Sequence, residues 1–294
     1  MRTSIFIFGL LLVFCGHAQD IASSATALLN SLDSKQKAKA QYVFDDNERF
    51  NWHFVPRSRN GIALRDLSSS QYQQVMTLLN ASLSEQGYTK ATGIVALENI
   101  LRELESRDAN DTYRDPLNYY VTIFGTPSKD KPWGWRFEGH HVSVNFASDK
   151  NELVSSTPSF FGSNPGIVPR GAQKGKELLK LETDFGFELC NALSTDQKKK
   201  AIFSDKALPE IIMSDRLKAE RIEPLGISYK EMNATQQQTF IRLLEVYVHN
   251  YQLGFADQLM SKIKKAGLDN LSFAWAGEVT PGNGTITAFR DPCY

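Results

Sequence analysis

The residues from Trp133 to Phe146, WGWRFEGHHVSVNF, bring together the side chains of this protein that are best suited to chemistry. Arg136, Glu138 and His140 alternate with apolar residues, and His141 follows directly. Side chains two apart in a strand point to the same face, so the three alternating polar residues are expected to share one face. A carboxylate and an imidazole at this spacing can ligate one metal ion or act as an acid–base pair.

Three interpretations of these polar residues stay open. The first is structural: an Arg136–Glu138 pair beside histidines that are exposed or hydrogen-bonded. The second is a metal or acid–base site formed by Glu138, His140 and His141, and the third is ligand binding without chemistry. One or two histidines need further ligands to hold zinc. The sequence therefore leaves the cofactor unknown, with a divalent metal ion as the candidate.

An arginine-rich segment, RFNWHFVPRSRNG at residues 49–61, adds candidates for ligand binding. Its arginines could bind an anion or a carboxylate through two parallel hydrogen bonds. Pockets commonly form where two halves of a chain meet, so we expect an unknown small molecule to bind there. The candidate ligand-binding residues are Trp52, Arg59, Trp133, Trp135, Arg136 and Phe161.

Two functional hypotheses follow from these candidates. One is a binding protein whose pocket lies between the two halves and is lined by Trp52, Arg59, Trp135 and His140. The other is a metal-dependent, hydrolase-like enzyme that uses Glu138, His140 and His141. Convergence of the enzyme candidates with His53 in one cleft would favour the second hypothesis.

The apolar residues of the same stretch predict a pair of strands. Trp133, Trp135 and Phe137 share one face by the two-residue period and are expected in the core. From Val142 onward the apolar residues occupy even numbers, which predicts a bulge or tight turn in which Gly139 supplies the unusual backbone. We therefore expect strands at 118–125, 133–139, 140–146 and 271–277.

The sequence repeats itself. LLNSLDSKQKAKA at 28–40 resembles LCNALSTDQKKKA at 189–201, and GIALRDLSSSQYQQVMTLL at 61–79 resembles GISYKEMNATQQQTFIRLL at 226–244. The two matches keep their order and nearly the same offset, which predicts an internal duplication. In each half a capping sequence, SSSQ or NATQ, precedes a long helix. Helices are expected at about 22–43, 71–86 and 90–106, and at about 172–203, 236–252 and 255–266.

These elements predict an α+β fold, in which helices pack on a small antiparallel sheet in two pseudo-symmetric repeats. We expect one globular unit with a first repeat at 19–157, a connecting loop at 158–171 and a second repeat at 172–294. Apolar residues make up 41% of the chain, which is enough for a sizeable core.

The N-terminus, MRTSIFIFGLLLVFCGHAQD, is typical of a secretory signal peptide that is cleaved after Ala18. Its apolar run is about half of the ~20 residues that a membrane span requires, and no later stretch is apolar enough to span. We therefore expect signal peptide 1–18 and an exported protein, periplasmic or secreted. Cys190 and Cys293 remain after cleavage, and they could form one disulfide. Cys190 lies in an apolar helical run and is expected to act as a small buried hydrophobe.

The charge balance gives no electrostatic reason to expect a nucleic-acid partner, because Lys+Arg and Asp+Glu both number 33. The sequence contains no zinc-finger spacing, no phosphate-binding Walker loop and no dinucleotide-binding glycine pattern. A G-x-S-x-G serine motif is also absent. The common nucleotide-dependent and serine-hydrolase classes are therefore not indicated.

Several segments together resemble the bacterial family called domain of unknown function 3500. They are RNGIALRDLSSSQ, LSEQGYTKATGIVALENILRELE, RDPLNYYVTIFGTP, WGWRFEGHHVSVNF and TPSFFGSNP. The resemblance covers nearly all of the mature chain. It implies an exported protein without an established activity, and the family pattern emphasises Arg59, Gly61, 114–116, 133–141 and 160–162.

The C-terminal residues depart from that family pattern. After FAWAG, family members continue with a strand pair that carries Tyr-Tyr and an acidic residue, followed by a tail with histidines. This chain instead reads EVTPGNGTITAFRDPCY. The departure predicts a truncated or divergent second repeat, in which residues 271–276 lose sheet partners and expose an edge. Tail histidines that could complete a site with His140 or His141 would then be missing.

Overall fold

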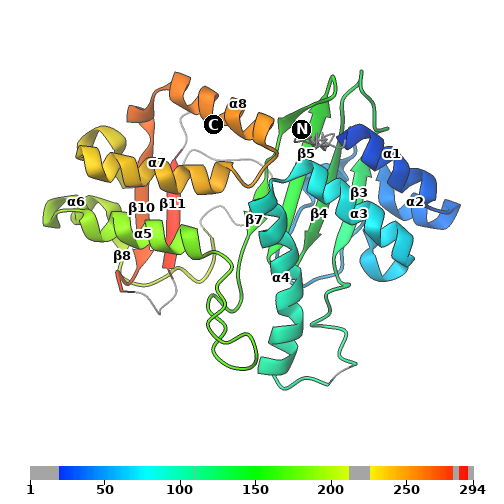
Figure 1. The fold of residues 1–294 in the computed structure, drawn as a ribbon, viewed down its shortest axis with the longest axis horizontal. Coiled ribbons are helices and arrows are strands. Elements are labelled where there is room, and N and C mark those ends of the chain that lie inside the picture. Colours follow the sequence, from blue (N-terminus) through cyan, green and yellow to red (C-terminus); the bar gives the residue numbers. More distant parts are fainter. Residues whose placement is uncertain (1–19, 109, 212–225, 281–284, 291–294) are drawn as a thin grey trace, which may run out of the picture.

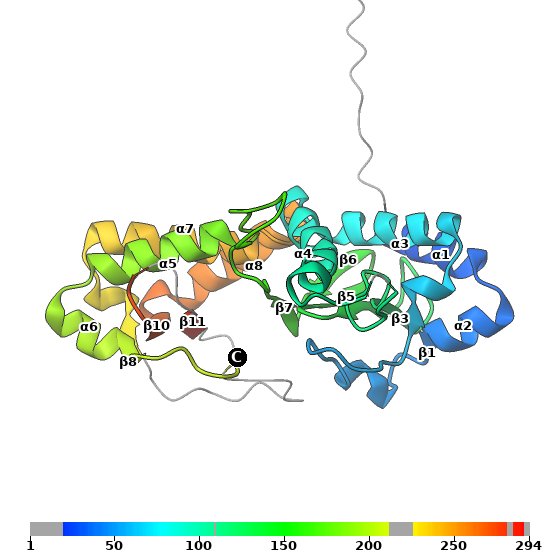
Figure 2. The same cartoon turned by 90° about the horizontal axis from the view of Figure 1, so that it is seen from below.

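The structure is a computed structural model that describes residues 20–108, 110–211, 226–280 and 285–290, with side chains up to residue 280. The predicted signal peptide and Cys293 lie outside the described residues. Figure 1 shows two lobes side by side, one from each half of the chain. In both lobes, helices cover one face of a sheet (Figure 2), which confirms the predicted α+β class.

The first lobe is built on a sheet whose main strand order is β1-β3-β4-β5-β6. β2 also pairs with β3, and β7 also pairs with β5. All pairs are antiparallel except β1 with β3, so the sheet is mixed and not purely antiparallel as predicted. The strands are β1 (Gln41–Tyr42), β2 (Ile62–Ala63), β3 (Tyr120–Phe124), β4 (Trp133–Gly139), β5 (Val142–Asp149), β6 (Glu152–Ser155) and β7 (Ser159–Phe161).

The helices α1, α3 and α4 of the first lobe contribute buried apolar residues to the core that they share with this sheet. In the helix that begins after Ser68, the buried apolar residues are Val75, Leu78 and Leu79, at the spacing that places them on one face. Ser68 caps this helix through a reciprocal pair of hydrogen bonds with Gln71. The helices are α1 (Ile21–Ser31), α2 (Ser34–Ala40), α3 (Ser69–Ser82) and α4 (Glu85–Leu104).

The second lobe has a smaller sheet, in which β10 lies between β11 and β8, and β9 also pairs with β10. β8 is parallel to β10, and the other pairs are antiparallel. Cys190 is buried in this lobe as predicted, and burial raises the pKa of its thiol to about 11. The elements are α5 (Lys180–Ala192), α6 (Thr195–Ala201), β8 (Ile202–Ser204), β9 (Ile227–Ser228), α7 (Ala234–Val248), α8 (Leu253–Ala266), β10 (Ser272–Gly277) and β11 (Thr285–Arg290).

The two lobes share local features at the positions that the sequence aligns. Gln71 donates to the carbonyl of Ser31 at the end of α1, and Gln236 donates to the carbonyl of Ala192 at the end of α5. Gly61 and Gly226 precede β2 and β9 with φ of 96° and 99°. These features agree with the duplication, whereas the pseudo-symmetry of the whole chain stays a prediction.

The lobes meet where two helix–helix turns lie against each other. Leu83, between α3 and α4, forms an isolated antiparallel bridge with Tyr251, between α7 and α8. The amide of Ser84 donates to the carbonyl of Asn250 at 3.1 Å, and the amide of Gln252 donates to the carbonyl of Ser82 at 3.1 Å. Tyr251 and Phe255 also pack into the core of the first lobe, so the junction combines backbone pairing with apolar contact.

Two predicted helices are shorter than the sequence pattern suggested. The helix expected at 22–43 is broken at Leu32 and Asp33, because Asp33 caps a new helix. The helix expected at 172–203 begins only at Lys180 and is broken at Leu193 and Ser194 for the same reason. In both places a capping residue competes with continuation of the preceding helix.

The predicted exposed edge in the second lobe is wrong. Residues 272–277 form β10, which pairs over its whole length with β11 on one side and contacts β8 and β9 on the other. The divergent C-terminal segment therefore supplies the sheet partner that was expected to be missing. Among the described residues, no helix has the length and apolar character needed to cross a membrane.

Candidate functional site

His140 and His141 form the two-residue tip of the β4–β5 hairpin, between the paired residues Gly139 and Val142. The unusual backbone lies at His141, whose φ is 58°, and not at Gly139 as predicted. Gly139 is required for a different reason: a Cβ there would overlap with the ring of Tyr119. The hydroxyl of Tyr119 donates to the carbonyl of His140 at 2.7 Å, which fixes the tip against β3.

One face of β4 belongs to the hydrophobic core, as the alternation predicted. Trp133, Trp135 and Phe137 are each at most 1% exposed and belong to the core of the first lobe. Trp135 stacks on Phe146 with a ring separation of 5.0 Å. Neither tryptophan lines a described cavity.

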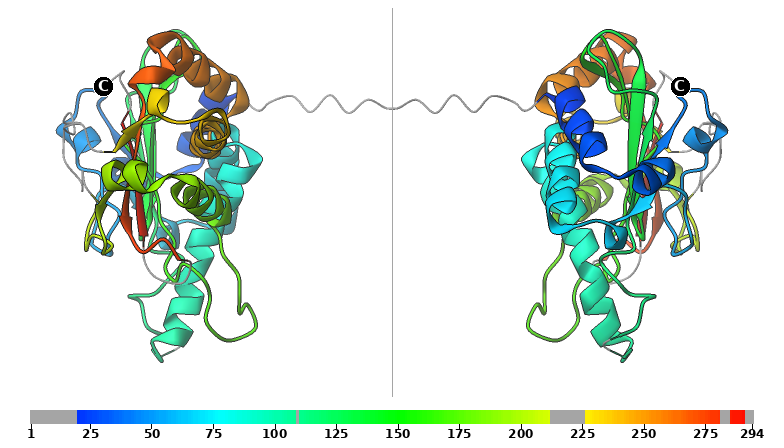
Figure 3. Two further views of the ribbon diagram at one scale, coloured as in Figure 1. Left: turned by 90° about the vertical axis from the view of Figure 1, so that its left-hand side faces the viewer. Right: turned by 90° about the vertical axis from the view of Figure 1, so that its right-hand side faces the viewer.

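The opposite face of β4 carries Arg136 and Glu138, and it is covered by the chain between β1 and β2. Figure 3 shows this segment crossing the sheet on the side away from the helices. Arg136 pairs with Glu138 at 2.8 Å and with Glu48 at 2.5 Å, and it also donates to the Glu48 carbonyl. Arg136 and Glu138 are completely buried. The geometry therefore agrees with the structural interpretation of the Arg136–Glu138 pair.

The Glu138 carboxylate also holds the covering segment in place. Its Oε2 accepts the amide hydrogen of His53 at 2.8 Å, and the Arg59 guanidinium lies 3.6 Å away. Burial raises the pKa of Glu138, while Arg136, Arg59 and the His53 amide act in the opposite direction. Its hydrogen-bonding capacity is thus directed toward arginines and backbone, not toward His140.

Arg59 braces the hairpin tip through backbone carbonyls. Its Nη2 donates to the carbonyls of Val55 at 2.5 Å and Gly139 at 3.0 Å, and its Nη1 donates to that of Arg57 at 2.9 Å. The side chain is only 3% exposed, and desolvation lowers its pKa. These contacts occupy most of the donors that a ligand carboxylate would need for two parallel hydrogen bonds.

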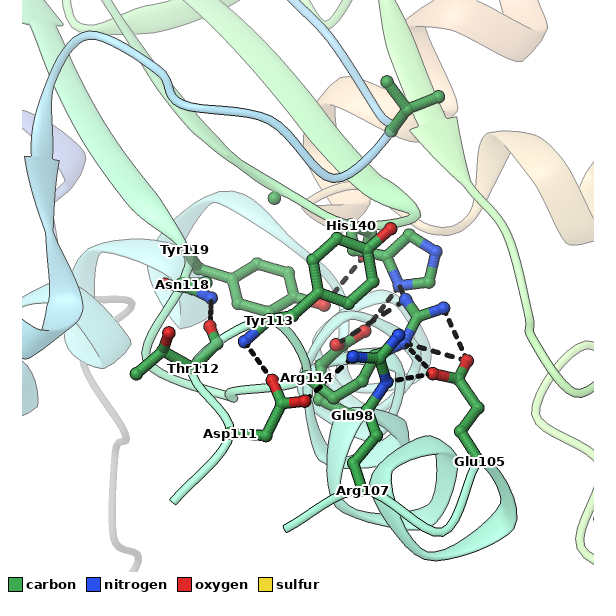
Figure 4. Close-up of polar contacts among 12 residues, drawn as sticks. Glu98, Glu105, Arg107, Asp111, Thr112, Tyr113, Arg114, Asn118, Tyr119 and His140 are labelled. Atoms are coloured by element: carbon green, nitrogen blue, oxygen red, sulfur yellow. Dashed lines mark hydrogen bonds and ion pairs between the residues drawn. The ribbon is translucent and has the colours of Figure 1, made fainter. Parts of the chain in front are cut away.

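His140 is held from the other side by α4 and the loop that follows it. Its Nδ1 lies 2.5 Å from a carboxylate oxygen of the buried residue Glu98, and Arg114 approaches the same nitrogen at 3.4 Å. Arg114 is in turn held by Glu105 at 2.7 Å. Figure 4 shows Glu98 and Arg114 converging on His140. Nε2 of His140 has no hydrogen-bond partner among the described residues. It is also not one of the polar atoms that are both fully buried and without a partner, so solvent reaches it.

A cavity of about 300 Å³ opens beside His140. Its lining comes from four regions of the first lobe: the segment before β2, α4, the loop from α4 to the first residue of β3, and the tip of the β4–β5 hairpin. The lining is polar and rich in tyrosine. It consists of Pro56, Arg57, Ser58, Arg59, Glu98, Thr112, Tyr113, Asp115, Asn118, Tyr119, Tyr120 and His140.

His141 lies behind His140 and is not part of this lining. The two rings are 4.1 Å apart, and the edge of His141 meets Phe160. Burial lowers the pKa of His141 to about 4, and the charges of His140 and Arg114 act in the same direction. Its Nδ1 is buried without a hydrogen-bond partner in the described part of the chain. His141 is thus held as a neutral ring at neutral pH.

The remaining sequence candidates are placed apart from the cavity. Trp52 packs on Phe54 at a ring separation of 5.9 Å, and Phe54 stacks on Phe160 at 4.2 Å. Phe161 packs against the core of the first lobe. Of the candidates, the cavity therefore unites Arg59 with His140, and it lies within the first lobe, whereas the predicted pocket lay between the halves.

A different cavity, of about 570 Å³, does lie between the lobes. It is formed by the α3–α4 turn and the α7–α8 turn, and none of the sequence candidates lines it. Its lining residues are Asn80, Leu83, Ser84, Glu85, Gln86, Tyr88, His249, Gln252 and Leu253.

The predicted metal ligands do not converge on one point. Glu138 faces the arginines under the covering segment, while His140 faces Glu98 on the other side of the hairpin tip. Within the described ranges, no group of three or more His, Cys, Asp or Glu side chains is arranged to hold a metal ion. The sequence argument missed Glu98, which the fold brings to His140 from 42 residues away.

Comparison with known proteins yields one match. A family model described as a protein of unknown function (DUF3500) matches residues 16–290, which is nearly the whole chain. No curated protein and no solved structure matches the sequence or the fold.

Proposed function

We infer the function of this chain, which belongs to the DUF3500 family of proteins of unknown function, from its site. We propose that it binds a small polar molecule in the cavity beside His140. The observation that carries the proposal is the convergence of a buried Glu98–His140 pair with tyrosine, amide and carboxylate groups around one cavity. Sites that place a few oriented polar groups in a concave surface are the usual places for small ligands.

The chemistry of the lining limits what such a ligand can be. The volume of about 300 Å³ is at the lower end for small-molecule sites, so the ligand is small. Tyr113, Tyr119 and Tyr120 are aromatic lining residues and Asn118 supplies an amide, although Arg65 and the carbonyl of Thr112 already contact that amide. A compact molecule with hydroxyl or amide groups matches these contacts better than an apolar one.

Thermal unfolding with a panel of small sugars, polyols, amino acids and carboxylic acids would test the proposal. A ligand at a hundred times its Kd stabilises the folded state by about 2.7 kcal/mol, which is readily seen as a higher Tm. We expect Tyr113→Ala to abolish the increase, because Tyr113 lines the cavity and is half exposed. Tyr88→Ala, in the other cavity, is the matched control and should retain it. A ligand that stabilises both variants equally would refute the assignment to this cavity.

A second candidate function is acid–base catalysis by His140. It is favoured by one observation: Nδ1 is held by a carboxylate while Nε2 is reached by solvent. A ring oriented in this way can take a proton from a bound hydroxyl group or water. The Glu138, His140 and His141 set is the less supported enzyme hypothesis, because its members do not converge.

Two measurements separate these candidates. Loss of hydrolysis of ester or amide substrates in His140→Gln, with ligand binding retained, would support catalysis. Metal analysis of the purified chain, beside the double variant His140→Ala/His141→Ala, tests the metal hypothesis, which requires near-stoichiometric metal in the wild type alone.

We also propose that the protein acts outside the cytoplasm, on the basis of the signal-like N-terminus. Cell fractionation and N-terminal sequencing of the mature chain would test this. A mature chain that begins at Gln19 is expected, and an intact Met1 in the cytoplasmic fraction would contradict export.

A further inference from the structure

A buried lysine, a buried glutamate and a buried asparagine meet at the junction of the two lobes. Nζ of Lys90, on α4, lies 2.6 Å from Oε1 of Glu182 on α5. The same nitrogen lies 2.8 Å from Oδ1 of Asn250, in the turn between α7 and α8. All three residues are more than nine-tenths buried. Figure 1 shows this turn lying beside the beginning of α4.

We propose that Lys90 and Asn250 form an intramolecular amide bond, with Glu182 as the general base. The bond would join Nζ of Lys90 to Cγ of Asn250 and would tie the two lobes together covalently. The reaction needs an amine, an amide carbon and a proton acceptor in one place shielded from water, and these are the three groups that meet here.

The distances bring the amine close to the amide carbon. Because Nζ is 2.8 Å from Oδ1 and a carbonyl bond is ~1.23 Å long, Nζ can be no more than about 4 Å from Cγ. The backbone around Asn250 is fixed by the bridge between Leu83 and Tyr251 and by the amide of Ser84. Gly87 permits α4 to lie this close to the turn, since a Cβ there would overlap with the backbone carbonyl of Asn250.

The amide is also polarised for attack. Oδ1 of Asn250 accepts from Nε2 of Gln86 at 3.0 Å in addition to Lys90. Gln86 is held in turn by the carbonyl of Val246 at 2.8 Å. A donor aimed at the carbonyl oxygen stabilises the negative charge that develops there when the amine adds.

Glu182 has the free oxygen that the proton transfers require. Its Oε1 contacts Lys90, whereas Oε2 is buried without a hydrogen-bond partner among the described residues. A buried carboxylate oxygen without a partner is costly, and here it is the oxygen that is available to the transferred protons.

The proposed step balances without an oxidant or a cofactor. Glu182 takes one proton from the Lys90 ammonium group, and the freed lone pair on Nζ forms a bond to Cγ. A second proton moves from this nitrogen, through Glu182, to Nδ2 of Asn250. The Cγ–Nδ2 bond then breaks, the carbonyl re-forms, and ammonia leaves. The product is a secondary amide between Lys90 and Asn250 in place of the primary amide of Asn250, and the first proton stays on Glu182.

Peptide mapping of the purified full chain tests the proposal. Trypsin does not cut at a lysine whose Nζ is acylated, so residues 66–102 and 243–262 should appear as one branched peptide, lighter by one ammonia than their sum. Whole-protein mass alone is insufficient, because cyclisation of an N-terminal Gln19 or of Asn60-Gly61 also releases ammonia. Recovery of the linear peptides 66–90, 91–102 and 243–262 in full yield from the wild type would overturn the proposal and leave an ordinary buried ion pair.

Variants identify the roles of the three residues. Glu182→Gln keeps the size of the side chain but cannot accept the proton, so the branched peptide should disappear. Asn250→Ala should lose it as well, whereas Gln252→Ala, two residues away and outside the contact, should retain it. A branched peptide that persists in Glu182→Gln would refute the role of Glu182.

A second measurement does not depend on the variants folding. A specific protease site inserted after Gly175, where the chain is exposed, would cut the connection between the lobes. After cutting and full denaturation, a linked wild-type chain should migrate as one species. Complete separation into two fragments would contradict the proposed bond.

Discussion

Nδ1 of His140 lies 2.5 Å from a carboxylate oxygen of Glu98, which reaches the hairpin tip from α4. A carboxylate can only accept a hydrogen bond, so in the neutral form of the ring this contact favours the proton on Nδ1 and leaves Nε2 unprotonated. In that form the ring presents an acceptor, not a donor, to its accessible side.

The tautomer of His140 can be measured directly. We expect nitrogen NMR of the wild type to show the Nδ1–H form for one neutral histidine, assigned by its loss in His140→Gln. In Glu98→Leu the carboxylate is absent, and the ring should shift toward the Nε2–H form. Glu103→Leu, on the same helix, is the control and should leave the tautomer unchanged. An Nε2–H ring in the wild type would contradict the geometry.

The buried ring of His141 makes stability depend on pH. Its pKa is lowered from 6.5 to about 4, mainly by burial. Between these values the unfolded chain binds a proton that the folded chain does not, so the free energy of unfolding falls as the pH falls. The loss from His141 is complete below about pH 4 and amounts to at most about 3 kcal/mol.

His141→Asn isolates this effect, because asparagine tolerates the positive φ of 58° but does not titrate. Urea unfolding of both proteins from pH 7 to pH 4 should show the wild type losing more stability than the variant. Parallel curves would mean that His141 takes up its proton without cost in the folded state.

The cluster under the covering segment predicts a large effect of Arg136. Its guanidinium lies between Glu48 and Glu138, and the side chain has no exposed surface. Arg136→Met would leave two buried carboxylates without their shared partner, which should cost about 3–5 kcal/mol of unfolding free energy. Arg242→Met removes a half-exposed arginine that pairs with Glu188, and it should cost at most about 1 kcal/mol.

The pH dependence of the Arg136→Met variant supplies a second readout. Burial already raises the pKa of Glu138, and loss of Arg136 should raise it further. A folded state that binds more protons than the unfolded state gains stability as the pH falls. The variant should therefore recover part of its loss, relative to the wild type, between pH 7 and pH 5. A constant difference would show that the carboxylates are not desolvated.

The strands around the site were predictable because their side chains alternate strictly. Trp133, Trp135 and Phe137 fill one face of β4, and its bounds match the expected 133–139. The turn was harder, because the unusual φ lies on His141 and not on the neighbouring glycine, and positive φ is uncommon in residues other than glycine. Sequence periodicity locates such a turn but does not say which residue adopts the rare conformation.

The helical periodicity of α4 contains a signal that could have revealed Glu98 as a member of the site. Ile94, Leu97, Glu98 and Leu101 follow the spacing of a buried helix stripe, and Glu98 is the charged member. A charged residue within an apolar stripe requires a buried partner. Which partner it meets depends on contacts across 42 residues, and no local pattern in one sequence gives that information. Asn250, in a turn, carries no such signal at all.

Gly61 and Gly226 offer a test of the predicted duplication. Both have φ near 100°, and in both a Cβ would overlap with a carbonyl oxygen of the neighbouring strand, that of Val121 or of Phe273. Alanine at either position should therefore cost about 2 kcal/mol or more, through the strained backbone and the displaced strand.

Gly166→Ala is the matched control, since no atom lies within 4 Å of the Cβ that it would add. Urea unfolding of the three variants should place Gly61→Ala and Gly226→Ala close together and Gly166→Ala near the wild type. If the two positions descend from one ancestral turn, they fulfil the same backbone requirement and the two losses should be similar. A large loss at one position and none at the other would mean that the shared sequence does not reflect a shared structural role.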